Sequence, residues 1–160
     1  MTLLHPGDPF PTMSVETLDG GVRLPADLHC DHSVILLFRG SWCPYCVSQL
    51  RAFERAHERF RQDHIALLAL SVDDRETTEL LVREHRLTFP IGYGVDAQEV
   101  AQATGAFLNE EQGYLQSTGF VLDGDGRVVI SVYSSGAIGR LVPEDVLGLV
   151  RYRVQGAAQH

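Results

Sequence analysis

Two cysteines stand where an apolar segment gives way to a helical pattern, and this junction constrains the chain more than any other feature. Residues 34–38 are continuously apolar, which is typical of a strand buried on both faces of a sheet. From Val47 to Phe60 apolar side chains recur every three or four residues, which predicts one amphipathic helix of about four turns. Cys43 and Cys46 lie between these elements. The sequence therefore places two thiols at the start of a helix.

A helix N-terminus is a favourable place for a reactive thiol. Its free N–H groups and the helix dipole stabilise an anion, and the thiolate is the reactive form of cysteine. We expect Cys43, at the edge of the helix, to be the more exposed and the more acidic thiol. Cys46 follows one turn deeper, close enough to attack a mixed disulfide formed on Cys43. Pro44 suits the first helical position, where its missing N–H has no partner to lose.

Three other interpretations of the pair stay open. A zinc site would use Cys43 and Cys46 together with Cys30 and either His29 or His32. The pair could also form a purely structural disulfide, or be an inert pair kept by packing. The order of strand, Cys-x-x-Cys and helix favours the redox interpretation, in which no metal and no cofactor is needed. Cys30 is then a small buried side chain, with a resolving or intermolecular role as the alternative.

The remaining pattern predicts an α/β fold in a single domain that spans residues 1–160. After an extended lead-in at 5–11, the predicted elements are strands at 13–18 and 65–72, a helix capped within 73–76 that reaches about 85, an extended piece at 89–91, a helix at 97–104, strands at 119–122 and 127–133 around a turn at 123–126, and a helix at 143–154. A strand–helix–strand order implies a parallel pair, and the late hairpin adds antiparallel strands. We therefore expect a mixed central sheet with helices on both faces.

Composition excludes several partners and chemistries. The net charge of -8 argues against nucleic acid, and no apolar run approaches the roughly 20 residues that a membrane span needs. Residues 1–11 do not resemble a signal peptide, and three cysteines without an export signal suggest a reducing, cytoplasmic compartment. The 13 basic residues are all arginine, which excludes Schiff-base and P-loop lysine chemistry.

The segment from Phe38 to Cys46 resembles the active-site segment of thioredoxin-fold proteins, and its most specific part is Trp-Cys-Pro-Tyr-Cys. Nearly the whole chain resembles the alkyl hydroperoxide reductase/thiol-specific antioxidant family, in its peroxiredoxin-like branch. The matching segments are Pro6-Gly7-Asp8 with Pro11, Leu18-Asp19-Gly20, Leu70-Ser71-Val72-Asp73, Phe89-Pro90, Phe120-Val121-Leu122-Asp123 and Asp125-Gly126. The resemblance implies a thioredoxin-like fold with an N-terminal β extension and thiol-based redox activity.

This resemblance also implies partners and an activity. Cys43 thiolate would attack a hydroperoxide or a disulfide, Cys46 would resolve the product, and an external thiol such as a thioredoxin would reduce the resulting disulfide. A homodimer is a further expectation. Protein disulfide reduction is the alternative activity, and a non-enzymatic module that binds a metal or a partner is a third possibility.

Two departures from the family pattern concern the surroundings of the pair. The position of the usual cis-proline is occupied by Ser117, followed by Thr118, so the usual backbone clamp on the substrate is altered. The family places Thr or Ser three residues before the reactive cysteine, whereas this chain has Gly40 there and Ser41 one residue later. The sequence offers Arg39 as the single cation near the thiols.

Two aromatic side chains flank the cysteine pair. We expect Trp42 to shield the thiol and to offer an apolar contact to a partner, or simply to pack. Tyr45 would donate a hydrogen bond near Cys43 or lie on the surface. These two residues, with Arg39, Ser41, Pro44, Ser117 and Thr118, are the predicted supporting residues of the site.

Overall fold

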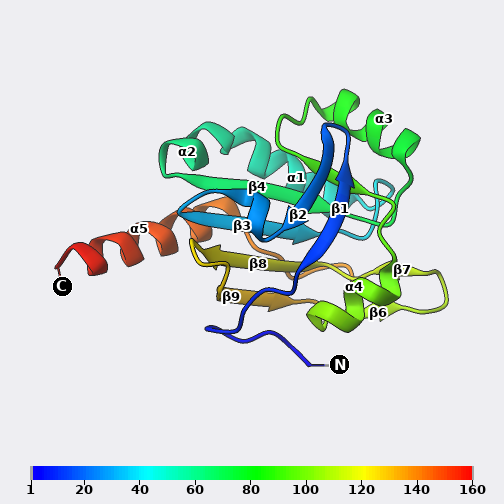
Figure 1. The fold of residues 1–160 in the computed structure, drawn as a ribbon. Coiled ribbons are helices and arrows are strands. Elements are labelled where there is room, and N and C mark those ends of the chain that lie inside the picture. Colours follow the sequence, from blue (N-terminus) through cyan, green and yellow to red (C-terminus); the bar gives the residue numbers. More distant parts are fainter. Residues whose placement is uncertain (1, 160) are drawn as a thin grey trace.

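The computed structural model describes residues 2–159, and its centre is a mixed sheet that runs β2-β1-β5-β4-β3-β8-β9 (Figure 1). The strands of this sheet are β1 (Met13–Thr17), β2 (Gly20–Leu24), β3 (His32–Leu37), β4 (Ile65–Leu70), β5 (Ile91–Tyr93), β8 (Thr118–Asp123) and β9 (Val128–Tyr133). The short strands β6 (Leu108–Asn109) and β7 (Tyr114–Leu115) form a separate ribbon. The helices are α1 (Pro44–Arg55), α2 (His57–Gln62), α3 (Arg75–His85), α4 (Ala97–Thr104) and α5 (Pro143–Gln159), with a 3-10 turn η1 (Ala26–Leu28).

Strand pairing confirms the predicted mixed sheet. β3 and β4 are parallel neighbours, and β8 runs antiparallel to both β3 and β9. The N-terminal extension is a hairpin of β1 and β2, whose first strand pairs antiparallel with β5. β2 does not follow from the sequence pattern, because the pair Gly20-Gly21 favours a turn, whereas in the structure it begins the second strand of the hairpin.

The sheet is covered on both faces, because alternate residues of a strand point to opposite sides. Val34 and Leu36 of β3 pack in a core with side chains of α1, α2, α3 and α5. Ile35 and Leu37 belong to a second core, built with α4 and the N-terminal segment. Every residue of β3 is buried, which explains its continuous apolar run.

The helix predicted through Phe60 is broken at Ala56. The Ala56 N–H is shared between the carbonyls of Ala52 and Phe53, at 3.2 Å each, and α2 restarts at His57. The cap of the next helix lies within the predicted residues 73–76. Asp74, not Asp73, caps α3, since its Oδ1 accepts the Thr77 N–H at 2.8 Å. Asp73 is thereby left for another partner, described below.

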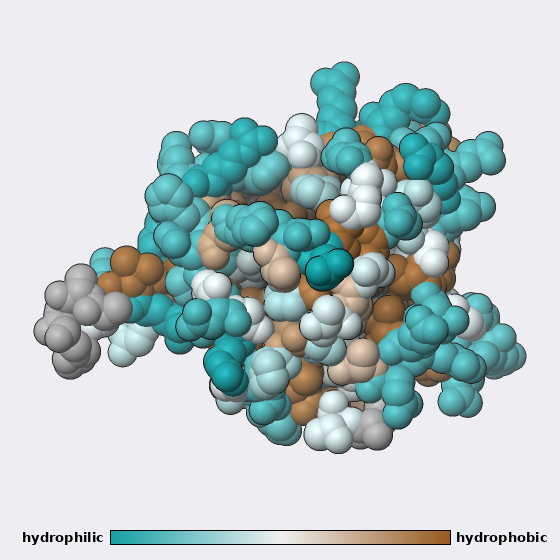
Figure 2. Space-filling model, in the orientation of Figure 1, coloured by the Kyte–Doolittle hydropathy of each residue, from teal (hydrophilic) through white to brown (hydrophobic). Residues whose placement is uncertain are grey.

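The last helix is longer than predicted and projects from the body of the protein (Figure 1). Val146, Leu147 and Val150 are buried in the core, whereas Tyr152 is 75% exposed. Figure 2 shows a largely hydrophilic face, with apolar side chains in its hollows and on the projecting helix. Among the described helices, none combines the length and the apolar character that crossing a bilayer requires.

Candidate active site

The cysteine pair lies at the junction between β3 and α1, as the sequence predicts. Cys43 is the N-cap of α1, and its Sγ accepts the Cys46 backbone N–H at 3.3 Å. Pro44 occupies the first turn of the helix, where its missing N–H costs no hydrogen bond. The two sulfurs are 2.7 Å apart and unlinked, and the Cys46 thiol donates to Cys43. The spacing therefore brings both thiols together in the reduced form.

Both thiols are buried, which contradicts the prediction that Cys43 is exposed. Each cysteine has 0% of its surface accessible, and both belong to the core on the α1 side of the sheet. The flanking aromatic residues are outside, with Trp42 55% and Tyr45 53% exposed. A substrate must therefore approach through the rim of side chains around the pair.

Arg39 lies beside Cys43, as the sequence predicted. Its Nη1 is 3.8 Å from Cys43 Sγ, and its backbone N–H donates to Cys46 Sγ at 3.4 Å. The guanidinium also donates to the Tyr114 hydroxyl at 2.9 Å and lies over the rings of Trp42 and Tyr114, about 5 Å from each centroid. Trp42 and Tyr114 therefore hold the guanidinium toward the thiols.

A second arginine reaches the pair, which the sequence analysis missed. Arg140 Nη2 donates to Cys46 Sγ at 3.1 Å and lies 3.8 Å from Cys43 Sγ. Its Nη1 donates to the Ala137 carbonyl, and its guanidinium lies 6.0 Å from the Tyr45 ring centroid. The prediction that Arg39 is the single nearby cation is wrong, because the segment after β9 folds back over the start of α1.

These contacts give the two thiols different acidities. Burial raises the pKa of Cys43, but hydrogen bonds from the Cys46 thiol and N–H, the charge of Arg140 and the Arg39 contact outweigh it, so this pKa is lowered. Burial and the hydrogen bond donated to Cys43 raise the pKa of Cys46, despite the Arg39 N–H and the charge of Arg140. The contacts therefore favour the thiolate at Cys43 and the protonated thiol at Cys46.

The loop before Cys43 is fixed by a carboxylate. Asp73 Oδ2 accepts the Ser41 backbone N–H at 2.8 Å, and Ser41 itself is half-buried. Gly40 lies next to the Trp42 indole, and a Cβ at Gly40 would overlap the ring, with Cδ1 only 2.7 Å away. The hydroxyl side chain that the family places at this position would therefore require Trp42 to move.

Ser117 and Thr118 are buried beside β3, and neither forms a hydrogen bond with the thiols in the described structure. The Ser117 carbonyl accepts the Ser134 N–H at 2.9 Å, and the Thr118 hydroxyl donates to the Gln116 carbonyl at 3.1 Å. Thr118 pairs with Leu37 at the end of β3. Within residues 2–159 the hydrogen bonds of these two residues thus tie the sheet together rather than bind a sulfur.

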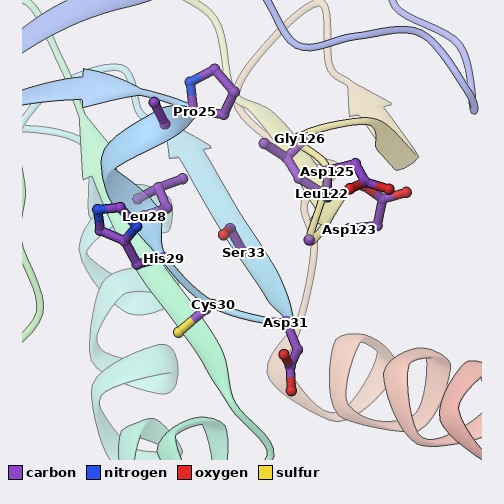
Figure 3. A pocket seen from close by; sticks show the side chains of 12 residues that line it. Pro25, Leu28, His29, Cys30, Asp31, Ser33, Leu122, Asp123, Asp125 and Gly126 are labelled. Carbon is purple, nitrogen blue, oxygen red and sulfur yellow. Dashed lines mark hydrogen bonds between the residues drawn. The ribbon is translucent and has the colours of Figure 1, made fainter.

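Cys30 lies at the opposite end of β3, which contradicts the proposed zinc set. The six residues of β3 separate it from the pair by about 20 Å. Figure 3 shows Cys30 and Asp31 beside a hollow of about 510 Å³, with Asp123 and Asp125 across it. Cys30 is half-buried rather than fully buried. In the described part of the chain, no group of three or more His, Cys, Asp or Glu side chains is arranged so that it could hold a metal ion.

Comparison with known proteins supports the sequence resemblance. The AhpC/TSA family profile matches residues 6–131. A peroxiredoxin of Methanothermobacter marburgensis is 27% identical over 152 residues, which cover 92% of this chain and 72% of the relative.

Solved structures with less sequence identity share the fold. The peroxiredoxin 6 of Arenicola marina superposes with a TM-score of 0.84 at 17% identity, over 98% of this chain and 76% of the other. AhpC of Mycobacterium bovis gives a TM-score of 0.79 at 20% identity, over 94% and 92% of the two chains. The expected thioredoxin-like α/β architecture is thus confirmed. With the family profile matched over most of its length, the chain belongs to the AhpC/TSA family of thiol-dependent oxidoreductases.

Proposed function

We propose that this protein reduces hydroperoxides with the Cys43–Cys46 dithiol, Cys43 being the nucleophile. The observation that carries the proposal is the difference in acidity between the two buried thiols. The pKa of Cys43 is lowered, whereas the pKa of Cys46, whose sulfur lies 2.7 Å from that of Cys43, is raised. A low pKa supplies the attacking thiolate, and a neighbour that keeps its proton is ready to resolve the product.

The reaction balances without a cofactor. The Cys43 thiolate attacks one peroxide oxygen, so an S–O bond forms, the O–O bond breaks and the alcohol or water leaves with a proton. Cys43 becomes a sulfenic acid. Cys46 then attacks the Cys43 sulfur, and a disulfide forms as water is released. Two external thiols, such as those of a thioredoxin, reduce the disulfide and are themselves oxidised to a disulfide.

The two arginines support charge stabilisation during this attack. Arg39 and Arg140 approach the pair from the loop after β3 and from the segment after β9, and each keeps a buried Nε–H with no acceptor in the described structure. As the O–O bond breaks, negative charge develops on the leaving oxygen, and oriented donors in a site that excludes water stabilise such charge. The guanidinium groups are the donors available for that role.

An apolar groove beside Arg140 suits the organic part of a hydroperoxide. Its volume is about 290 Å³, and its wall includes Tyr45, Ile138 and Val142, all partly exposed apolar side chains. Arg140 lines the same groove and reaches the thiols. The groove therefore supports an alkyl hydroperoxide at least as well as hydrogen peroxide.

Disulfide reduction is the alternative activity, favoured by the position of the Cys-x-x-Cys pair at a helix N-terminus. The burial of both sulfurs favours a small peroxide over a protein disulfide. The homodimer and the cytoplasmic location expected from the sequence stay predictions, and sedimentation velocity tests the first.

Steady-state turnover separates the two activities. We expect consumption of hydrogen peroxide and cumene hydroperoxide, with a thiol donor present, well above the rate of free cysteine, and little acceleration of insulin disulfide reduction. Cys43→Ser should abolish peroxide turnover. Cys46→Ser should keep the first oxidation but stop the cycle, and Cys30→Ser is the matched control that should leave turnover unchanged. Full activity in Cys43→Ser would instead assign the nucleophile to Cys46.

A further inference from the structure

A groove on the outer face of α1 runs from the loop before Cys43, at Ser41 and Trp42, to two arginines. Its volume is about 360 Å³, within the range of small-molecule sites, and its lining residues are Ser41, Trp42, Pro44, Val47, Ser48, Arg51 and Arg55. The groove lies on the same helix as both cysteines but on the exposed side, away from the core. The proposed chemistry assigns no role to its basic end.

The positions of Arg51 and Arg55 do not stabilise α1. They are four residues apart, so the two like charges are neighbours on the helix surface, an arrangement that weakens a helix. Arg59, Arg61, Arg75 and Arg151 each pair with a carboxylate, whereas neither groove arginine does so within the described structure. The one carboxylate tied to the rim, Asp73, accepts the Ser41 N–H. The groove thus has two positive charges, and neither of them forms an ion pair in the described structure.

The direction of the helix brings these charges toward the reacting sulfurs. Side chains of an α-helix lean toward its N-terminus, so the two guanidinium groups lean toward the Cys43 end of the groove. Arg51 follows Pro44 by seven residues, a rise of about 10 Å along the helix. A molecule of modest length can therefore contact an arginine with one end and reach the rim beside Trp42 with the other.

We propose that this groove binds a small thiol bearing one or more carboxylates, and that this thiol reduces the Cys43–Cys46 disulfide. The proposal rests on the proposed function, which requires a donor of two electrons. Guanidinium groups bind carboxylates through paired hydrogen bonds, which accounts for the charged end of the donor. The size of the groove and the burial of the sulfurs favour a small donor over a protein thiol.

The reduction consumes two donor molecules. The first donor thiolate attacks one sulfur of the disulfide, which forms a donor–protein disulfide and releases the other cysteine as a thiolate that takes up a proton. A second donor thiolate attacks the donor sulfur, so the donors leave as a disulfide and the remaining cysteine is released. The groove accelerates these steps by raising the local concentration of the anionic donor.

The test compares thiols of different charge on the oxidised full-length protein. The disulfide is formed with one equivalent of hydrogen peroxide or, independently of peroxide chemistry, with diamide. Its reduction by mercaptosuccinate, 2-mercaptoethanol and cysteamine is followed by the fluorescence of Trp42, the chain's only tryptophan, and by alkylation and mass spectrometry. The variant is Arg51→Gln/Arg55→Gln. The control, Arg23→Gln/Arg83→Gln, removes the same charge from exposed sites on β2 and α3.

We expect the groove variant to lose roughly threefold to tenfold in the mercaptosuccinate rate, as two exposed ion pairs would give. The 2-mercaptoethanol rate should not change, and the control variant should behave as wild type. An equal loss in both double variants, or no loss in either, would overturn the proposal. So would a loss confined to reduction by a thioredoxin, which would indicate a protein partner. Failure of peroxide to form the disulfide contradicts the proposed function but leaves this test intact, because diamide supplies the same disulfide.

Discussion

Arg140 Nη2 lies 3.1 Å from Cys46 Sγ, although 94 positions separate the two residues in the chain. The contact places a permanent positive charge beside a buried dithiol, in addition to the one that Arg39 supplies. It also joins the segment after β9 to the first turn of α1. The acidity of Cys43 therefore depends on a residue outside the Cys-Pro-Tyr-Cys segment.

Arg140→Gln should raise the pKa of Cys43 and slow its reaction with peroxide roughly tenfold to a hundredfold. The charge of Arg140 lowers that pKa, and one lost donor in a site of developing charge has an effect of this order. Stopped-flow fluorescence with hydrogen peroxide measures the rate. Arg59→Gln is the control, because Arg59 is exposed and paired with Glu144. An unchanged rate and an unchanged Cys43 pKa in Arg140→Gln would show that the contact is structural only.

Alkylation should distinguish the two cysteines by pH. Because the pKa of Cys43 is lowered and that of Cys46 is raised, the thiolate fraction of Cys43 exceeds that of Cys46 at any pH between the two values. Iodoacetamide should therefore modify Cys43 before Cys46 in this range, as peptide mapping in a Cys30→Ser background would reveal. If the order were reversed, the roles assigned to the two thiols would have to be exchanged.

Gly40→Ala should displace the Trp42 side chain. A Cβ at Gly40 would overlap the indole, and Trp42 is exposed enough to swing outward, so we expect a shift in fluorescence emission and a stability loss of about 1 kcal/mol. Gly136→Ala is the control, because no atom lies within 4 Å of a Cβ there. Identical emission spectra for wild type and Gly40→Ala would mean that the indole does not occupy this space.

Asp73→Ala should loosen the loop before the cysteines, because the Ser41 N–H loses its acceptor, at a cost of about 1–2 kcal/mol in the free energy of unfolding. Burial raises the pKa of Asp73, so the stability gained by protonating this carboxyl is full below the unfolded pKa and is lost as pH rises through the folded pKa, whereas the hydrogen bond from the Ser41 N–H remains in the ionised form. Asp73→Asn keeps an acceptor without the charge, and should match or exceed wild type at pH 7. Urea unfolding at pH 7 measures both variants. Equal stability of Asp73→Ala and wild type would show that the hydrogen bond contributes nothing.

Local patterns predicted the elements that carry the thiols. The apolar run of β3, the 3.6-residue period of α1 and the position of Pro44 each follow from short-range physics, and the sequence contains all of it. The helix at 97–104 was also predicted to its last residue, because Gly105 ends it in the left-handed conformation. The break at Ala56 was not predicted, since nothing in the local composition interrupts the helical period there.

The long-range contacts of the site could not be predicted from the sequence. Arg140 and Tyr114 reach the site from segments far along the chain. The sequence around each residue does not indicate which residue it contacts. The only indication of Arg140 as a site residue was a basic residue in the Ser- and Gly-rich segment after the last strand. The expected exposure of Cys43 was wrong for the same reason, because the side chains that bury it come from elsewhere in the fold.

The most direct test of the account is a titration of the reduced protein with hydrogen peroxide in a Cys30→Ser background. We predict that one equivalent of peroxide removes two thiols and forms one disulfide, which peptide mapping identifies as Cys43–Cys46, at a rate far above that of free cysteine. Cys46→Ser in the same background should instead accumulate a dimedone-reactive sulfenic acid on Cys43. Oxidation no faster than that of free cysteine, or a sulfenic acid found on Cys46 in Cys43→Ser at the wild-type rate, would contradict the account.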